Sequence, residues 1–158
     1  MKKAFTLIEA TVVVAIIGIL TLMAVVTFNS KTDVSNELEA KNTLVNLMNI
    51  NDNTYLASNS INSLSQIISK DSTHTYQSNS STGINIISYS PGSSNFGGAV
   101  ASPTGCWYLL KNYQPSSANP AMLWAYKSGA TTCLGSDALN LSDPLTGKGY
   151  SEDKPILL

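Results

Sequence analysis

The fold prediction starts from the first stretch of the chain, "MKKAFTLIEATVVVAIIGILTLMAVV" (Met1–Val26). Its apolar run begins at Phe5 and continues to Phe28 without a proline, and Glu9 is the one charged residue in it. At about 1.5 Å per helical residue, this run reaches roughly 36 Å, which is enough to cross a bilayer with some tilt. The stretch therefore predicts a membrane-spanning helix at the start of the chain.

Lys2 and Lys3 in front of an apolar run are also typical of a secretory signal peptide. Two features disfavour that interpretation. The run is longer than the hydrophobic core of a signal peptide, and the polar segment that follows, "NSKTDVSNELEAK", offers no small-residue cleavage site. We therefore expect the apolar helix to remain on the mature protein.

Glu9 is the feature of this helix that needs an explanation. An ionised carboxylate at the centre of a bilayer costs about 2.5 kcal/mol or more, so such a residue is usually kept because a partner neutralises it. The alternative is that Glu9 lies close enough to the helix end for its side chain to reach the lipid headgroups.

The residues after the apolar run continue with a helical period. No glycine or proline interrupts the chain from Ile19 to Ala57, so one continuous helix is predicted through Ala57. In the second half of this helix, one apolar stripe falls within an arc of about 120° and is predicted to face a soluble domain. Leu47 and Ile50 fall outside this stripe. Its members are Val34, Leu38, Leu44, Val45, Met48, Tyr55 and Leu56.

After Ala57 the composition changes to serine, asparagine, glycine and threonine. "SINSLSQIISK" has its apolar residues three and four apart, which predicts a short second helix. "GINIISYS", "CWYLLKNY" and "AMLWAYKS" are rich in β-branched and aromatic residues and predict strands. The turn-rich "QPSSANP" between the last two predicts an antiparallel hairpin. The fold class is therefore α+β, with a long N-terminal helix packed on a small antiparallel sheet.

Length and charge restrict the classes of function. The 158 residues make about one domain, and the nine basic residues, all lysine, are balanced by ten acidic ones. There is no basic run after Lys3, which disfavours nucleic acid as a partner. The only histidine, His74, is expected in an exposed loop or at a strand edge rather than as a ligand or general base. We therefore predict neither an enzyme nor a cofactor or metal site.

Three further groups of residues have a structural and a functional interpretation. Cys106 and Cys133 are predicted to form one disulfide, because the exported part of the chain reaches an oxidising compartment and a C-x-x-C spacing is absent. Two buried thiols are the alternative.

Four aromatic residues at strand spacing favour core packing over a surface-binding patch. The acidic residues near the C-terminus favour a solvated loop over a calcium site. The aromatic residues are Trp107, Tyr108, Trp124 and Tyr126, and the acidic ones are Asp137, Asp143, Glu152 and Asp153.

The segment "KKAFTLIEATVVVAIIGIL" (Lys2–Leu20) resembles the N-terminal signature of type IV pilins and of the pseudopilins of type II secretion. The resemblance covers about the first 25 residues. It implies that a prepilin peptidase cuts between Ala4 and Phe5 and methylates the new amino group of Phe5. It also implies that Glu9 meets the amino group of Phe5 on a neighbouring subunit and thereby sets the register of assembly. Two residues depart from the family pattern: Ala4 stands where a glycine is usual, and Val26 stands where many major pilins have a proline.

The resemblance also implies an organisation and a function. A leader is expected at residues 1–4, a transmembrane and filament-core helix at 5–28, its amphipathic continuation at 29–57, and a β-rich head with a disulfide-closed C-terminal loop at 58–158. The precursor would cross the inner (cytoplasmic) membrane once, with Lys2 and Lys3 on the cytoplasmic side. The cut subunit would then leave the lipid and polymerise with identical copies, helped by the pilus assembly machinery, into a surface filament for adhesion, motility or uptake.

Two other hypotheses remain open from the sequence. The chain could be a minor pilin or pseudopilin of a secretion or DNA-uptake machine, present in few copies. It could also be a membrane-tethered enzyme or binding module whose apolar helix is only an anchor.

Overall fold

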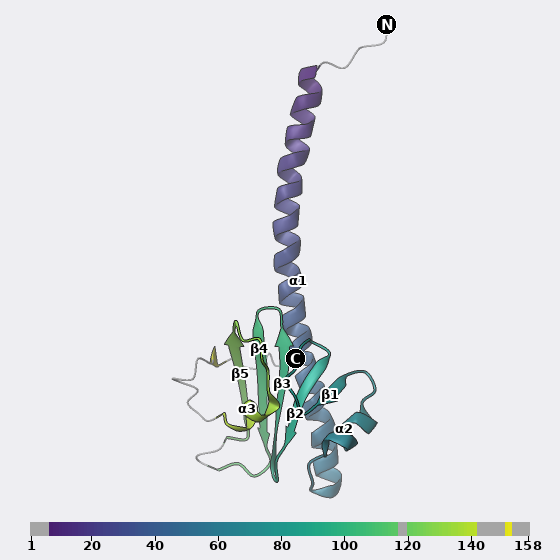
Figure 1. Ribbon diagram of the computed structural model, residues 1–158, viewed down its shortest axis with the longest axis vertical. Coiled ribbons are helices and arrows are strands. Elements are labelled where there is room, and N and C mark those ends of the chain that lie inside the picture. Colours follow the sequence, from purple (N-terminus) through teal and green to yellow (C-terminus); the bar gives the residue numbers. More distant parts are fainter. Residues whose placement is uncertain (1–6, 117–119, 142–150, 153–158) are drawn as a thin grey trace. The chain divides into compact units, whose positions relative to one another are not determined.

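The structure is a computed structural model that describes residues 7–116, 120–141 and 151–152, of which residues 25–31 and 151–152 are described by backbone only. The chain divides into two compact units, Met1–Ser35 and Asn36–Leu158. Figure 1 shows the long helix α1 (Leu7–Ser58), to which both units contribute residues, and the sheet of the second unit.

The described part of the first unit is helical, as the sequence predicts. α1 is one α-helix of 52 residues, so the predicted continuity to Ala57 is confirmed, whereas Phe5 lies outside the described residues. Two threonine hydroxyls of the apolar segment are satisfied within the helix, because Thr11 donates to the Ile8 carbonyl (2.9 Å) and Thr21 to the Ile17 carbonyl (2.7 Å). These bonds let two threonines lie on an apolar helix without unpaired donors.

The second unit is a mostly antiparallel sheet with three helical segments, which confirms the α+β class. The strand order is β1-β2-β3-β4-β5-β6; β1 runs parallel to β2, and every other neighbouring pair is antiparallel. The predicted short helix, the three predicted strands and the hairpin β4–β5 are all present. The bounds are α2 Leu64–Lys70, β1 Thr75–Gln77, β2 Ile86–Pro91, β3 Asn95–Ser102, β4 Gly105–Asn112, β5 Met122–Ser128, α3 Gly135–Leu139 and β6 Ser151–Glu152.

Strand β3 was not predicted, because its sequence "NFGGAVAS" contains two adjacent glycines, which are unfavourable in an isolated strand. Its position explains them. A Cβ on Gly97 would lie 2.1 Å from the carbonyl oxygen of Gly135, and one on Gly98 would lie 2.6 Å from Cδ2 of Leu47. Gly97 therefore allows α3 to approach one face of the sheet, and Gly98 allows α1 to approach the other.

The sheet is buried on both faces, which is why β4 is almost continuously apolar. One cluster packs against α1 and the other against α3, and alternate residues of β4 point into the two clusters. The buried members of the α1 cluster are Ala40, Leu44, Leu47, Ile67, Tyr76, Ile87, Tyr89, Phe96, Val100, Trp107, Leu109 and Trp124. The buried members of the α3 cluster are Ala99, Cys106, Tyr108, Leu110, Leu123, Ala125, Cys133, Ala138 and Leu141.

The predicted apolar stripe of α1 is confirmed at Leu44, Val45 and Met48, which lie in the core or pack against it, and is wrong along one edge. Leu38 is 45% exposed and Leu56 86% exposed, whereas Leu47, which fell outside the stripe, is fully buried. At 100° per residue, the centre of the fully buried residues lies roughly 100° from the centre of the predicted stripe, and the two overlap at Leu44. The difference arises because Gly98 of β3 leaves room for the side chains of Leu44 and Leu47, so this side of α1 packs on the sheet. The buried residues of this face are Ala40, Thr43, Leu44, Leu47 and Asn51.

Candidate functional site

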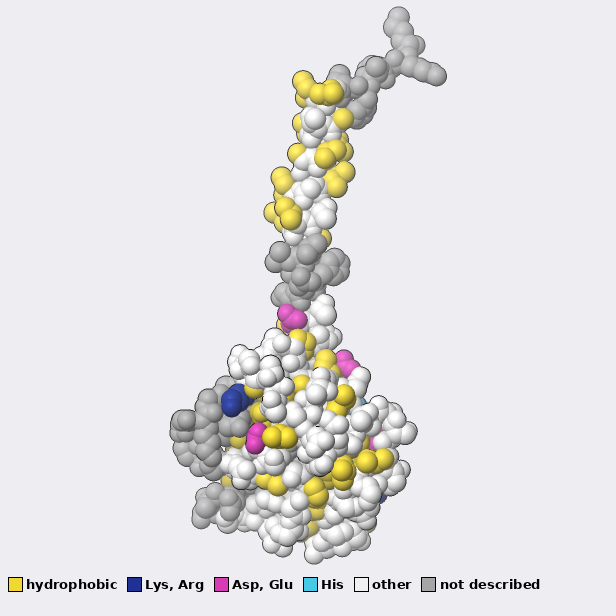
Figure 2. Space-filling model, viewed as in Figure 1, with side chains coloured by type: hydrophobic (Ala, Val, Ile, Leu, Met, Phe, Trp, Pro, Cys, Tyr) yellow, Lys and Arg dark blue, Asp and Glu magenta, His cyan; other side chains and the backbone are white. Residues whose placement is uncertain are grey.

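The first candidate site is the apolar part of α1. The segment Leu7–Ala24 has a mean hydropathy of 2.4, and none of it is buried within the chain. Figure 2 shows hydrophobic side chains standing out from this part of the helix. The large ones are between 46% and 81% exposed: Leu7, Ile8, Val12, Val13, Val14, Ile16, Ile17, Ile19, Leu20, Leu22 and Met23. A surface of this size and polarity requires lipid or other helices around it.

Glu9 lies in the first turn of α1 and is exposed. A carboxylate in this turn complements the partial positive charge of the helix N-terminus. By the helical period, Glu9 shares its face with Ile16 and Leu20, so the carboxylate stands on a bulky apolar surface. If that surface entered lipid or a helix bundle, the carboxylate would require a positive partner. Ala4 and Phe5, the expected cleavage site, lie outside the described residues.

Gly18 is on the same helix and has no packing role among the residues that the structure describes. A Cβ added to Gly18 would meet nothing within 4 Å, so the fold described here does not require a glycine at this position. Glycine in a helix interior costs about 0.8–1 kcal/mol relative to alanine. Its presence is therefore consistent with a close contact made by another molecule.

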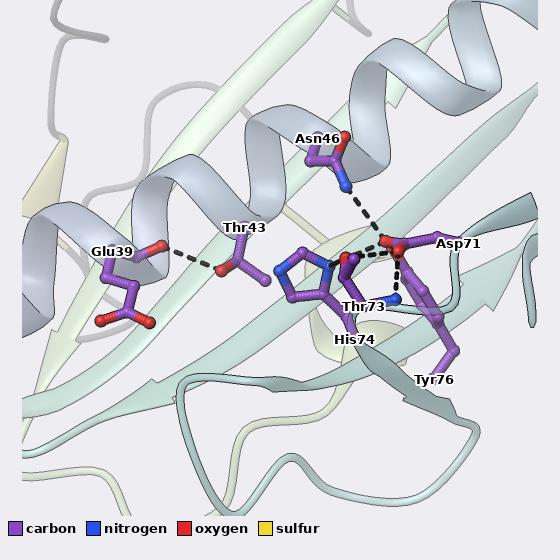
Figure 3. Close-up of polar contacts among 7 residues, drawn as sticks. All are labelled: Glu39, Thr43, Asn46, Asp71, Thr73, His74 and Tyr76. Carbon is purple, nitrogen blue, oxygen red and sulfur yellow. Dashed lines mark hydrogen bonds and ion pairs between the residues drawn. The ribbon is translucent and has the colours of Figure 1, made fainter.

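His74 lies directly before the edge strand β1, which agrees with the predicted strand-edge position, but its ring is not freely exposed and has two polar partners. Its side chain is 18% exposed, and Nδ1 lies 2.8 Å from Oδ2 of Asp71 and 2.8 Å from Oγ1 of Thr73. Figure 3 shows the ring beside the Asp71 carboxylate. Both contacts use the same ring nitrogen, so this is not the arrangement of a catalytic triad, in which the two nitrogens have different partners.

Asp71 was not predicted as a structural centre, yet its carboxylate joins three parts of the second unit. Oδ2 accepts hydrogen bonds from Nδ2 of Asn46 on α1 (3.0 Å) and from the Tyr76 hydroxyl on β1 (2.6 Å), and Oδ1 accepts from the Thr73 backbone N–H (2.8 Å). Figure 3 shows these side chains converging on the carboxylate. The signal available in the sequence was the Asp-x-Thr spacing at the end of the short helix, which favours an Asx turn.

The ionisation of Asp71 follows from this environment. Burial raises the pKa of the carboxyl, but hydrogen bonds from Thr73, Tyr76 and His74 outweigh burial and hold the pKa well below its usual range. Burial, together with the bond to the Asp71 carboxylate, raises the pKa of the Tyr76 hydroxyl well above its usual range. At neutral pH, Asp71 is therefore an acceptor and Tyr76 a donor.

This arrangement predicts an acid-sensitive stability. The pKa of Asp71 is lower in the folded state than in the unfolded state. The contribution of Asp71 to the free energy of unfolding is therefore fully present above the unfolded-state pKa of about 3.9 and is lost as the pH falls below about 4. We expect Asp71→Asn to lower the melting temperature at pH 7 and to weaken the loss of stability between pH 5 and pH 2. Thermal melts over this pH range measure it, with Asp137→Asn as the matched control. An unchanged melting temperature at pH 7 would contradict the role given to Asp71.

The aromatic residues are core residues, as predicted. Trp107, Tyr108 and Trp124 are buried, and Trp107 pairs across β4 and β5 with Tyr126 at a ring-centroid distance of 4.6 Å. Nζ of Lys41 lies 4.1 Å from the centroid of the Trp107 ring. These contacts fix α1 against the sheet, so the group is accounted for by packing.

The structure contains the disulfide between Cys106 and Cys133, whose Cα atoms are 5.5 Å apart. Cys106 is on β4, and Cys133 lies between β5 and α3, so the bond closes the β4–β5 hairpin together with the connection to α3. The same connection is tied to the segment before β2, because the Ser81 N–H donates to the Cys133 carbonyl (2.8 Å). The disulfide therefore holds the start of α3 against the sheet.

The acidic C-terminal residues are only partly described. Asp137 lies in the first turn of α3, Asp143 and Asp153 lie outside the described residues, and Glu152 is described by its backbone in β6. Among the residues that the structure describes, no group of three histidine, cysteine, aspartate or glutamate side chains could hold a metal ion.

Comparison with known proteins gives one match. A family model described as "Prokaryotic N-terminal methylation motif" matches residues 1–25. No curated protein and no solved structure matches the chain. The matched segment includes Glu9 and all of the exposed apolar segment Leu7–Ala24.

Proposed function

The chain carries at residues 1–25 the prepilin-type leader of type IV pilins and pseudopilins, and from this premise we propose that it is the structural subunit of a type IV pilus. The leader indicates a pilin-like structural protein that is processed by a prepilin peptidase. The observation that supports the proposal most strongly is the exposure of the entire Leu7–Ala24 segment, because an apolar helix with no cover from its own chain is what a filament core requires.

Assembly by this helix is an exchange between two apolar surroundings. Lipid tails are about as apolar as the helix, so moving from the membrane into a bundle of identical helices gains little from the hydrophobic effect. Packing between helices, charge pairing and work by the assembly machinery must supply the difference. The exposed Gly18 would allow one such close helix contact.

Glu9 and Phe5 are the residues proposed to set the register. Cleavage after Ala4 would create a positively charged amino group at Phe5, and Glu9 of one subunit would pair with that group on the next. A charge pair inside an apolar bundle adds little net stability, because desolvation offsets much of the attraction. It does penalise every alignment that leaves the carboxylate buried without its partner, and this is the property that a regular filament needs.

Before assembly, the precursor would cross the cytoplasmic (inner) membrane once. Lys2 and Lys3 would stay on the cytoplasmic side, as positive charges flanking a membrane helix generally do. The second unit, with its disulfide, would lie on the oxidising side, where cysteines pair. The assembled form would be a filament on the cell surface.

The alternative is a minor pilin or pseudopilin, since the same leader occurs in those proteins. The two roles differ in copy number. A major subunit dominates filaments sheared from the cell surface, whereas a minor subunit is found there in traces or remains with the machine. Quantifying the chain in sheared filaments separates them.

The cleavage itself is the first prediction of the proposed function. In filament protein, intact-mass analysis is expected to show a chain that lacks Met1–Ala4 and carries one added methyl group on the amino group of Phe5. Substitution of Ala4 by a large residue, Ala4→Trp, should leave the uncut precursor in the membrane, whereas Ala4→Gly should be cut normally. Surface filaments built from a chain that still begins at Met1 would refute the pilin interpretation and favour a simple membrane tether.

A further inference from the structure

A groove lies between the C-terminal part of α1 and the end of α2. It has a volume of about 370 Å³ and is lined by Ile50, Asn53, Thr54, Ala57 and Lys70. Ile50 is half-buried and Ala57 is exposed, so the groove presents apolar side chains to the surface. Nearby on these helices, Leu56 is 86% exposed and Ile68 is 50% exposed.

Lys70 gives this apolar groove a fixed positive charge. Nζ of Lys70 donates to Oδ1 of Asn62 (2.7 Å) and to the hydroxyl of Thr54. Asn62 is itself fully buried and held by Asn51, since its Nδ2 lies 3.2 Å from Oδ1 of Asn51. The ammonium group is therefore positioned at the groove instead of moving freely in solvent.

The same unit carries a complementary surface near the start of its part of α1. Leu38 is 45% exposed, and the next residue, Glu39, is exposed as well. The backbone carbonyl of Glu39 accepts the Thr43 hydroxyl (2.9 Å), and Figure 3 shows its carboxylate pointing away from the Asp71 cluster. Leu38 and Glu39 are consecutive helix residues about 100° apart, so they present an apolar side chain and a carboxylate on adjoining sides of α1, and these complement the apolar groove and its ammonium group.

The two surfaces cannot meet within one chain. Leu38 and Glu39 precede the middle of the groove by about 15 residues of the same helix, which is roughly 22 Å along its axis at 1.5 Å per residue. A contact between the two surfaces must therefore join two copies. The contact is heterologous, because the two surfaces differ and lie at different positions along one helix. A heterologous contact builds an open helical filament when the rotation between neighbouring subunits does not close a ring.

We propose that the groove formed by Ile50, Asn53, Thr54, Ala57 and Lys70 binds the Leu38–Glu39 surface of a second copy of this chain, with Lys70 opposite Glu39 of that copy. The proposal rests on the filament function above and adds to it a specific contact between the second units of two copies. Pairing of Glu9 would align the apolar helices, and this contact would align the second units.

The test exchanges the two charges in the full chain in cells that form filaments. Lys70→Glu and Glu39→Lys each place like charges opposite each other at every repeat, and we expect each to reduce the yield of sheared filaments by about tenfold or more. The double variant restores opposite charges and is expected to recover most of the yield. Asp33→Lys is the matched control, because it reverses an exposed charge six residues earlier on the same helix. Adding Lys70→Glu to Asp33→Lys should not raise the yield of filaments.

A second variant does not depend on the internal bonds of Lys70. Ala57→Trp fills the groove from an exposed position and should reduce filament yield, whereas Ser78→Trp, also at an exposed position, should not.

In every variant, formation of the Cys106–Cys133 disulfide and the amount of membrane precursor report whether the chain folds. If Glu39→Lys and Ala57→Trp form filaments at the wild-type level, or if the double charge exchange gives no recovery, the proposed contact is wrong. If wild-type filaments do not contain the chain at all, the filament function fails first.

Discussion

Replacing Glu9 with valine is expected to abolish filaments while leaving the precursor in the membrane. The variant removes the proposed partner of the Phe5 amino group, and an unpaired charge inside an apolar bundle costs about 3–5 kcal/mol. That cost corresponds to a loss of roughly 10²- to 10³-fold or more in the association constant at every subunit added. The second unit should be unaffected, because Glu9 is exposed on the first unit.

The measurement compares sheared filaments with precursor in the membrane fraction for the wild type and for Glu9→Val, Glu9→Gln and Thr11→Val. Glu9→Gln keeps the size of the side chain and removes its charge, so it should resemble Glu9→Val. Thr11→Val is the control, because the Thr11 hydroxyl is satisfied by the Ile8 carbonyl of its own helix and should be dispensable. Normal filaments from both Glu9 variants would show that the carboxylate has no role in assembly.

Removing the disulfide is expected to have the largest effect on the stability of the second unit. The bond joins residues 27 apart in the chain, for which the chain-entropy estimate is about 3.6 kcal/mol. Domains are stable by about 5–15 kcal/mol in total, so this is a large share. The Cys106→Ala/Cys133→Ala variant should melt roughly 10 °C or more below the wild type and be digested faster by protease.

The full chain in detergent is suitable for this experiment, with a reducing agent as the internal control. The reductant should lower the melting temperature of the wild type, once the bond opens, and leave that of the double alanine variant unchanged. Two titratable thiols in denatured, unreduced wild-type protein would refute the bond, and equal melting temperatures would refute its importance. Both cysteines are fully buried, so the comparison has to be made under conditions that reduce the bond completely.

Local chemistry made several elements predictable. The apolar composition and the lack of glycine and proline after Gly18 predict α1, and β-branched and aromatic runs predict β2, β4 and β5. The glycines of β3 had the opposite effect, because Gly97 and Gly98 weaken a strand when they are considered alone. Only the approach of α3 and α1 to the two faces of the sheet explains them.

The polar centre at Asp71 could not have been predicted as such. Its partners Asn46 and Tyr76 are 25 and 5 residues away in the chain, and the first of these separations carries no local signal. The partners of His74, which was expected in an exposed loop or at a strand edge, were not foreseen either, because a histidine among serine and threonine residues gives no sign of a carboxylate held in place by another helix.

The sequence by itself determined the parts of this protein whose chemistry is local. A membrane-length apolar helix, a carboxylate near its start, a motif for cleavage and methylation at residues 1–25 and two cysteines are all properties of consecutive residues or of composition. The tertiary structure decided which face of α1 is buried. The hydrophobic pattern placed Leu38 and Leu56 on the buried face together with Leu44, but close packing of Leu44 and Leu47 on Gly98 left Leu38 and Leu56 exposed. The physical reason is that burial depends on the shape of the surface that covers a helix, and the strand that provides this surface lies some 50 residues further along the chain.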